Sequence, residues 1–193
     1  MKRLVLEDIK NLQDYELERP DFKARIIELK KRRRIPLGNL MTLVFENRET
    51  VRFQIQEMVR IERIARPEKV REELDVYNDL LPGEGEVAAT LFIEVAESEK
   101  IRSTLDRFVG LDEPGKVALR IGARSFPAAF APGQSREDRI SAVHYVRFPL
   151  GEEGRKALAR GEPAAVEVRH ADYHAFAPLP AGTVSELLGD LSR

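Results

Sequence analysis

The sequence predicts an α+β protein, with a mainly helical N-terminal part followed by a mixed or antiparallel sheet with flanking helices. Two observations support this class. In residues 1–82 apolar residues recur mainly at helical spacing, whereas in residues 83–193 short runs alternate between apolar and polar residues. Helices followed by strands in this way are typical of α+β architecture. No long linker separates the two parts, so we expect a single α+β domain over residues 1–193.

The N-terminal part is predicted to begin with two helices and a strand. A short helical turn is expected around residues 7–12. Pro20 is expected to open the second helix, in which Phe22, Ile26 and Leu29 are spaced i, i+4, i+7. The basic run KKRRR ends that helix. NLMTLVF then follows as a strand, because it is rich in apolar and β-branched residues.

Two further helices complete this part. Asn47 can cap a helix that runs to about Ala65. Its opening, TVRFQIQ, also alternates like a strand, but the apolar helical pattern continues beyond it and favours a helix. Pro67 starts the next helix, whose apolar stripe reaches Leu81. PGEG then breaks the chain.

The second part is predicted to be mainly strands. They are expected at EVAATLFIEV, KVALRIG, SFPAAFA, SAVHYVRF and AAVEVRH. The first of these strands places its apolar residues on one face: Val87, Ala89, Leu91, Ile93 and Val95. Helices are expected at SEKIRSTLDRFVG, which Gly110 stops, in a short segment ending at Gly161, and at the C-terminus. There Thr183 and Glu186 have the spacing of a capping box. APGQSREDR is predicted to be an exposed loop.

The composition excludes several classes of function. Of the 193 residues, 42% are hydrophobic and 34% charged, as in ordinary globular proteins. The chain contains no cysteine, which excludes disulfides, thiolate metal sites and cysteine nucleophiles. A net charge of −1 argues against general binding of polyanions. We find neither a signal peptide nor an apolar run of roughly 18 residues, so we expect a cytoplasmic protein.

Polar residues interrupt the apolar face of the helix at residues 51–64. On a helical wheel, Gln54 and Glu62 fall on this face, above and below Met58. A buried carboxylate is costly unless it is paired. Glu62 therefore predicts a partner, and we expect an arginine or histidine from the strand region 141–148. The partner would form either a structural salt bridge, which we favour, or a polar pocket between helix and sheet.

The same helix supplies candidate functional residues, although no known catalytic motif is present. Glu57 and Arg60 are spaced i, i+3 and would pair on the surface. In an enzyme, Glu57 or Glu62 would lie beside His144 across a pocket between helix and sheet. The candidate binding residues are Gln54, Gln56, Arg60 and Tyr77.

The histidines offer a candidate metal site. His144 and His170 lie on strand faces that we expect to point toward the core. His170, Asp172 and His174 are spaced by two, so an extended chain would align them, and two histidines with a carboxylate can hold iron, zinc or manganese. HADYH resembles a turn, however, and a half-buried histidine is more often a hydrogen-bonded core residue than a ligand.

A basic run, residues 30–34, is a candidate contact for nucleic acid. Basic residues in the last turn of a helix also complement the helix dipole and stay solvated. No aromatic residue is interleaved with the run, so we prefer the second interpretation.

Three segments together resemble a bacterial family, domain of unknown function 3501. They are VRFQIQEMVRIERI, EELDVYNDLLP and SAVHYVRF, and the likeness covers nearly the whole chain. The matching positions are Gln54, Gln56, Glu57, Met58, Arg60, Glu62, Glu73, Leu74, Tyr77, Ser141, Ala142, His144 and Phe148. The resemblance brings no established activity, cofactor or catalytic residue.

The resemblance implies a redox setting, because genes of this family lie near genes for rubrerythrin-like di-iron proteins and iron–sulfur oxidoreductases. A chain without cysteine and with three histidines is poorly suited to carry electrons itself. Our first hypothesis is therefore an accessory or binding protein that works with an oxidoreductase or di-iron protein and has no chemistry of its own. A small-molecule or metal-dependent enzyme is the second hypothesis, and nucleic-acid binding is the third.

Overall fold

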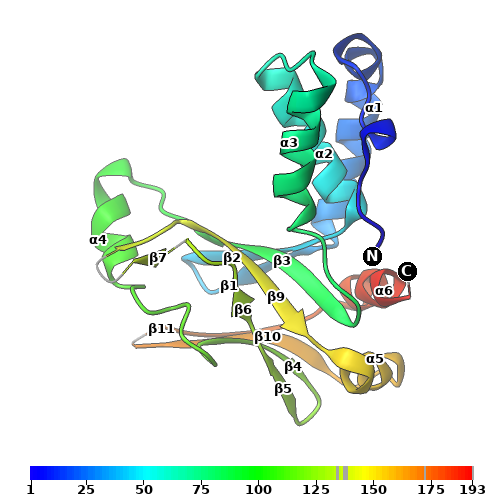
Figure 1. Cartoon of the computed structure of the whole chain (residues 1–193). Helices are drawn as coiled ribbons and strands as arrows, with labels where there is room; N and C mark the ends of the chain where they lie inside the picture. The colour runs from blue at the N-terminus through cyan, green and yellow to red at the C-terminus, as the bar shows by residue number, and fades with distance from the viewer. Residues whose placement is uncertain (134, 137–138, 172, 193) are drawn as a thin grey trace.

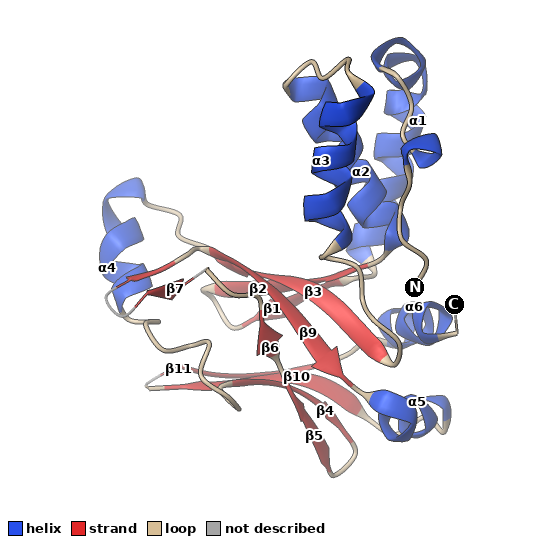
Figure 2. Cartoon of the chain, in the orientation of Figure 1, coloured by secondary structure: helices blue, strands red, loops and turns tan. Residues whose placement is uncertain are grey.

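Three helices form a bundle that stands on a β-sheet, and a second sheet lies beneath the first (Figure 1). The bundle comprises α1 (Leu12–Lys31), α2 (Arg48–Ile61) and α3 (Pro67–Asn78). This computed structural model describes residues 1–133, 135–136, 139–171 and 173–192. The bundle lies outside the two layers of strands and against the first sheet (Figure 2). The predicted α+β class is therefore confirmed.

α1 is one continuous helix and does not begin at Pro20, as we had expected. The Asn11 side chain accepts a hydrogen bond from the backbone N–H of Asp14 and so caps the helix at its start. Pro20 lies inside the helix, where a proline removes one backbone hydrogen bond. Packing offsets this loss, because Phe22 lies edge-on to Phe53 of α2 with 5.5 Å between the ring centroids.

α2 and α3 begin where the sequence predicts. The Asn47 side chain accepts hydrogen bonds from two backbone N–H groups of the first turn of α2, and Pro67 is the first residue of α3. α2 ends at Ile61, earlier than expected, because Arg63 has a φ of 53°, a left-handed conformation that stops the helix. The two helices share an apolar cluster that includes Val51, Ile55, Val59, Val70 and Leu74.

The first sheet is antiparallel and has the strand order β1-β2-β3-β9-β6. Its strands are β1 (Arg34–Leu37), β2 (Met41–Glu46), β3 (Glu86–Ile93), β6 (Ala129–Phe130) and β9 (Val143–Pro149). β1 was not predicted. It is a short strand that continues directly from the basic run after α1, and it pairs with β2.

The second sheet is also antiparallel, with the order β11-β10-β4-β5. Its strands are β4 (Val117–Ile121), β5 (Arg124–Pro127), β10 (Ala164–His170) and β11 (Tyr173–Pro178). β7 (Ser135–Arg136) and β8 (Arg139–Ile140) pair in the segment predicted as a loop. The predicted strand SFPAAFA is divided between β5 and β6, so the chain passes from one sheet to the other there.

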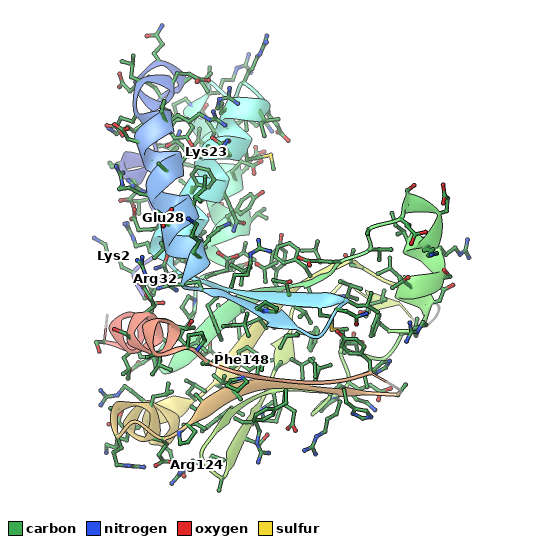
Figure 3. All side chains as sticks on the ribbon, turned by 180° about the vertical axis from the view of Figure 1, so that it is seen from behind. Lys2, Lys23, Glu28, Arg32, Arg124 and Phe148 are labelled. Carbon is green, nitrogen blue, oxygen red and sulfur yellow. The ribbon has the colours of Figure 1, made fainter. Side chains whose placement is uncertain are left out.

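The main core lies between the two sheets. As predicted, β3 turns Val87, Ala89, Leu91 and Ile93 inward, and Phe148 of β9 lies between the layers (Figure 3). The remaining helices flank the sheets: α4 (Ile101–Asp106), α5 (Gly151–Ala159) and α6 (Ala181–Leu191), with short 3₁₀ turns at Leu6–Asp8 and Ser98–Lys100. Within the described part of the chain, none of the helices combines the length and apolarity that a bilayer crossing needs.

The predicted capping box of the last helix is wrong. α6 begins at Ala181 after Pro180, so Thr183 and Glu186 lie inside the helix. Both side chains bond to the end of α1 instead. The Thr183 hydroxyl donates to the Arg32 carbonyl oxygen at 2.6 Å, and Glu186 accepts from the guanidinium groups there.

Candidate functional site

A row of residues crosses the outer face of the first sheet beneath the helical bundle. Glu46 of β2 lies opposite Ala88 of β3. Arg147 of β9 also lies opposite Ala88, from the other side. Directly opposed residues of antiparallel strands point to the same face, and strands are about 4.8 Å apart, so roughly 10 Å separates the Cα atoms of Glu46 and Arg147. The side chain between them is a single methyl group.

This row is the floor of a cavity of about 490 Å³, which we call the junction pocket. Small residues also line the pocket: Ala88 lies between Glu46 and Arg147, and Ala129 of β6 lies opposite Arg147 on its other side. Its walls include Tyr145 of β9, which points to the same outer face as Arg147, and Leu80, which follows α3. The pocket therefore lies between the C-terminal end of α3 and the outer face of the sheet.

Glu46 is the most buried charged residue of the junction pocket, with 3% of its surface exposed. Each of its carboxylate oxygens accepts one hydroxyl hydrogen bond. Thr50 donates to Oε2 at 2.5 Å, and Thr90 donates to Oε1 at 2.7 Å. The carboxylate is thus held in one orientation by a residue of α2 and a residue of β3.

Local sequence explains why a carboxylate is tolerated at this position. Glu46 directly precedes Asn47, the N-cap of α2, and the N-terminus of a helix favours a nearby negative charge. Thr50 contributes twice, because its hydroxyl oxygen also accepts a hydrogen bond from the Asn47 backbone N–H at 2.9 Å. The Thr50 hydroxyl therefore stabilises both the start of α2 and the orientation of the Glu46 carboxylate.

Arg147 forms the opposite side of the junction pocket. Its guanidinium donates to the carbonyl oxygen of Asp79, the C-cap residue of α3, where cations complement the helix dipole. It also lies 3.8 Å from the Glu86 carboxylate of β3. Arg147 is consequently held between the helical bundle and the sheet.

Glu62 does not meet a residue of strand region 141–148, so that expectation is wrong. It is the C-cap of α2 and is exposed, because α2 ends before it turns this position inward. The charge of Glu62 nevertheless affects the pKa of a neighbouring carboxyl group. Burial raises the pKa of Glu73 on α3, and repulsion by Glu62 raises it further. Burial likewise raises the pKa of Tyr77, with smaller contributions from Tyr145 and Glu73.

Glu57 and Arg60 do not simply pair with each other on the surface; each bonds to α1. Arg19 binds both oxygens of Glu57, at 2.7 and 2.9 Å, and the Tyr15 hydroxyl donates to Oε1 at 2.7 Å. Arg60 donates to Glu16 at 2.6 Å. The Arg19 guanidinium holds the pKa of the Glu57 carboxyl below its usual range. Glu57 therefore joins two helices and lies outside the junction pocket.

Gln56 and Asn78 hold the N-terminal segment to the bundle. The Gln56 amide exchanges two hydrogen bonds with the backbone of Lys10, at 2.9 and 2.8 Å. Asn78 does the same with the backbone of Leu4. Gln54, expected on the buried face, is half-buried, because the buried stripe of α2 runs through Gln56 instead.

His144 faces the core between the two sheets, as expected, and so points away from the helical bundle. Its Nε2 donates to the Ser141 carbonyl oxygen at 2.8 Å, and Phe130 lies edge-on to its ring. Burial lowers the pKa of this imidazole. A site that combines His144 with Glu57 or Glu62 is therefore not assembled, since a sheet separates them.

The expected alignment of histidines for a metal site is also not found. His170 is buried and its Nε2 donates to the Arg107 carbonyl oxygen at 3.1 Å. His174 is exposed, because β11 places it opposite Arg169 on the other face of the hairpin. Asp172 lies outside the described residues. Among the residues that are described, no three histidine or carboxylate side chains gather closely enough to hold a metal ion.

Arg32 and Arg33 of the basic run, at the C-terminal end of α1, serve the structure. Arg33 is fully buried and binds Asp190 at 2.7 Å and Glu186 at 2.9 Å. Arg32 lies at the end of α1 that faces α6 (Figure 3) and donates to Glu186 at 2.8 Å. These charges tie α1 to α6.

Sequence reasoning missed the residues of the junction pocket. Glu46, Thr90 and Arg147 come from three strands, and only the strand register brings them together. One signal was available. Each of these residues occupies the strand face opposite the apolar one, and a buried outer face is indicated when that face carries small residues such as Ala88.

The fold and the pocket define the class: an α+β protein with a pocket, bordered by charged residues, between its helical bundle and the outer face of one sheet. The chain belongs to the family described as protein of unknown function DUF3501, whose model matches residues 3–191, so the resemblance stated above is confirmed. It is also similar to a crystal structure of a novel protein of unknown function from Burkholderia pseudomallei. The two are 33% identical with a TM-score of 0.91, over 98% of this chain and 100% of that one. No curated protein gives a significant match.

Proposed function

We propose that this protein is a binding protein, without chemistry of its own, that takes a small polar molecule into the junction pocket and works as an accessory to a redox system. The observation that carries the binding role is the buried Glu46 carboxylate on the floor of a cavity of about 490 Å³. Cavities of about 300–1,000 Å³ with a few fixed polar groups are typical of small-molecule sites.

Binding is favoured over catalysis because the polar groups of the pocket are held in place. Both oxygens of Glu46 already accept threonine hydroxyls, which fixes the carboxylate as an acceptor. Arg147 is likewise held by the end of α3. The enzyme hypothesis relied on Glu57, Glu62 and His144, which lie in three separate environments. Nucleic-acid binding relied on the run 30–34, in which Arg32 and Arg33 are held by α6.

A thermal-shift screen tests the binding role. The protein is melted with a library of small polar metabolites, alongside Ala88→Met, which fills the pocket floor, and Ala159→Met, a control at an exposed position of α5. A ligand at 100 times its Kd stabilises by about 2.7 kcal/mol. At about 2–4 °C per kcal/mol for a chain of this size, we expect the Tm to rise by roughly 5–11 °C in the wild type and in Ala159→Met. Ala88→Met should show no rise; equal rises in all three proteins would refute the proposal.

The redox part of the proposal rests on the family resemblance. The accessory role, in place of electron transfer by this chain, rests on a sequence with no cysteine and three histidines. It predicts that the protein binds an oxidoreductase or a di-iron protein of its own host. Tagged protein incubated with native host lysate should enrich such a partner, as quantified by mass spectrometry against a tag-only control. Recovery of no redox protein would contradict the redox part of the proposal. The binding role would not be affected, because the thermal-shift screen tests it separately.

A further inference from the structure

Building on the proposed binding role, we propose that the ligand of the junction pocket is a small organic cation, a primary amine or a guanidinium, and that Glu46 is its counter-ion. The charges that line the pocket are the first argument. Its acidic residues are Glu46, Asp79 and Glu86, and its basic residue is Arg147. The lining is therefore negative overall.

The guanidinium of Arg147 already has partners within the protein. Its guanidinium caps α3 through the Asp79 carbonyl oxygen and lies 3.8 Å from the Glu86 carboxylate. Glu46 has a different surrounding. In the described part of the chain its polar partners are the hydroxyls of Thr50 and Thr90, and no arginine, lysine or histidine forms an ion pair with it. Buried carboxylates are normally paired with a cation. Glu46 has no such partner among the described residues, and the pocket beside it has room for a cationic ligand.

The hydrogen-bonding capacity of Glu46 supports the same ligand. An ionised carboxylate offers about four acceptor positions, of which the two threonine hydroxyls use two. An ammonium or guanidinium carries several N–H donors and can fill the remaining positions. A carboxylate or phosphate ligand would instead face the Glu46 oxygens with its own lone pairs and charge.

The walls and dimensions of the pocket fit a short organic cation. Tyr145 lines it from the outer face of β9, and the faces of aromatic rings attract cations. Glu86 lies on the same strand face as Ala88, two residues away, so a second carboxylate borders the cavity. The Glu86 carboxylate already accepts the Gly83 backbone N–H and lies beside Arg147, so Glu46 is the charge left for a ligand. The short apolar chain of such a ligand can lie along Ala88 and Tyr145.

Isothermal titration calorimetry tests the cation. The probes are 1,4-diaminobutane and its monoguanidino derivative agmatine, with 1-butanol and glutarate as neutral and anionic comparisons. We expect saturable binding of at least one cation and no binding of the comparisons. Glu46→Gln should weaken the cation about tenfold or more, because a charged hydrogen bond is lost. Glu57→Gln, which removes a half-buried carboxylate outside the pocket, should leave the affinity unchanged.

A second variant covers the case in which Glu46→Gln fails to fold, as judged by its melting curve. Ala88→Met keeps Glu46 and its threonines but fills the floor, and it should abolish cation binding. Equal affinity in Glu46→Gln and the wild type, or in Ala88→Met and the wild type, would overturn the inference. Binding of glutarate or 1-butanol in place of the cations, and sensitive to Ala88→Met, would overturn the cation but keep the binding role. No binding of any probe, with no hit in the metabolite library, would remove both.

Discussion

Replacing Arg33 by methionine is expected to be the most destabilising change in the basic run. The guanidinium is fully buried and donates to Asp190 at 2.7 Å and to Glu186 at 2.9 Å. The Asp190 side chain is 6% exposed and would lose its cation, whereas Glu186 would keep Arg32. Removing one partner of a buried ion pair costs about 3–5 kcal/mol, since a buried charge is left uncompensated.

Thermal and urea denaturation measure this loss. For a chain of 150–250 residues, about 2–4 °C of Tm accompanies each kcal/mol, so Arg33→Met should melt roughly 6–20 °C below the wild type. The double variant Arg33→Met with Asp190→Leu should recover part of the loss, because replacing both partners by apolar groups is often close to neutral.

Arg32→Met is the matched control. It removes the neighbouring guanidinium, whose side chain is 51% exposed and bonds to the same carboxylate, Glu186. Exposed ion pairs contribute about 0–1 kcal/mol, so this variant should melt within about 4 °C of the wild type. If Arg33→Met were no more damaging than Arg32→Met, burial of the ion pair would not explain how α1 is attached to α6.

Three further predictions concern other buried polar groups. Arg19 lowers the pKa of Glu57 in the folded protein. The stability that this ion pair contributes is present above the unfolded pKa of about 4.5 and is lost as the pH falls through the folded pKa. The stability difference between wild type and Glu57→Gln should therefore shrink in urea melts between pH 6 and pH 3. Burial lowers the pKa of His144, so stability should fall as the pH drops below about 6.5, and His144→Phe should show a flatter profile in the same melts. Gln56→Ala removes two hydrogen bonds to the Lys10 backbone and should cost about 2 kcal/mol, with faster hydrogen exchange around Lys10 and no change around Leu4, which Asn78 holds.

Local pattern was sufficient to predict most elements of the fold. The cap at Asn47, the proline at the start of α3 and the inward face of β3 depend on residues close together in sequence. Failures occurred where distant packing decides. Pro20 remains inside α1 because aromatic contacts with α2 offset its missing hydrogen bond, and β1 exists because it pairs with β2.

The candidate site could not be predicted for a related reason. A helical wheel placed Glu62 on the apolar stripe of α2, but the helix ends before that position. Glu46 was passed over because it follows a run of apolar residues and precedes a helix cap, so it had no pattern of its own. Its importance follows from Thr90 on the neighbouring strand and from Ala88, and strand register is a property of the folded sheet.

A crystal structure of the protein soaked with 1,4-diaminobutane or agmatine would test the role of the junction pocket most directly. We expect density for the cation in the cavity between Glu46 and Arg147, with a ligand nitrogen within hydrogen-bond distance of a Glu46 carboxylate oxygen. The same soak of Glu46→Gln should leave that position without the ligand. An empty pocket at saturating ligand would contradict the assignment of Glu46 as the binding group. A ligand bound instead in a second cavity of the protein, which is lined by residues that include Ile9 and Val70, would also contradict it.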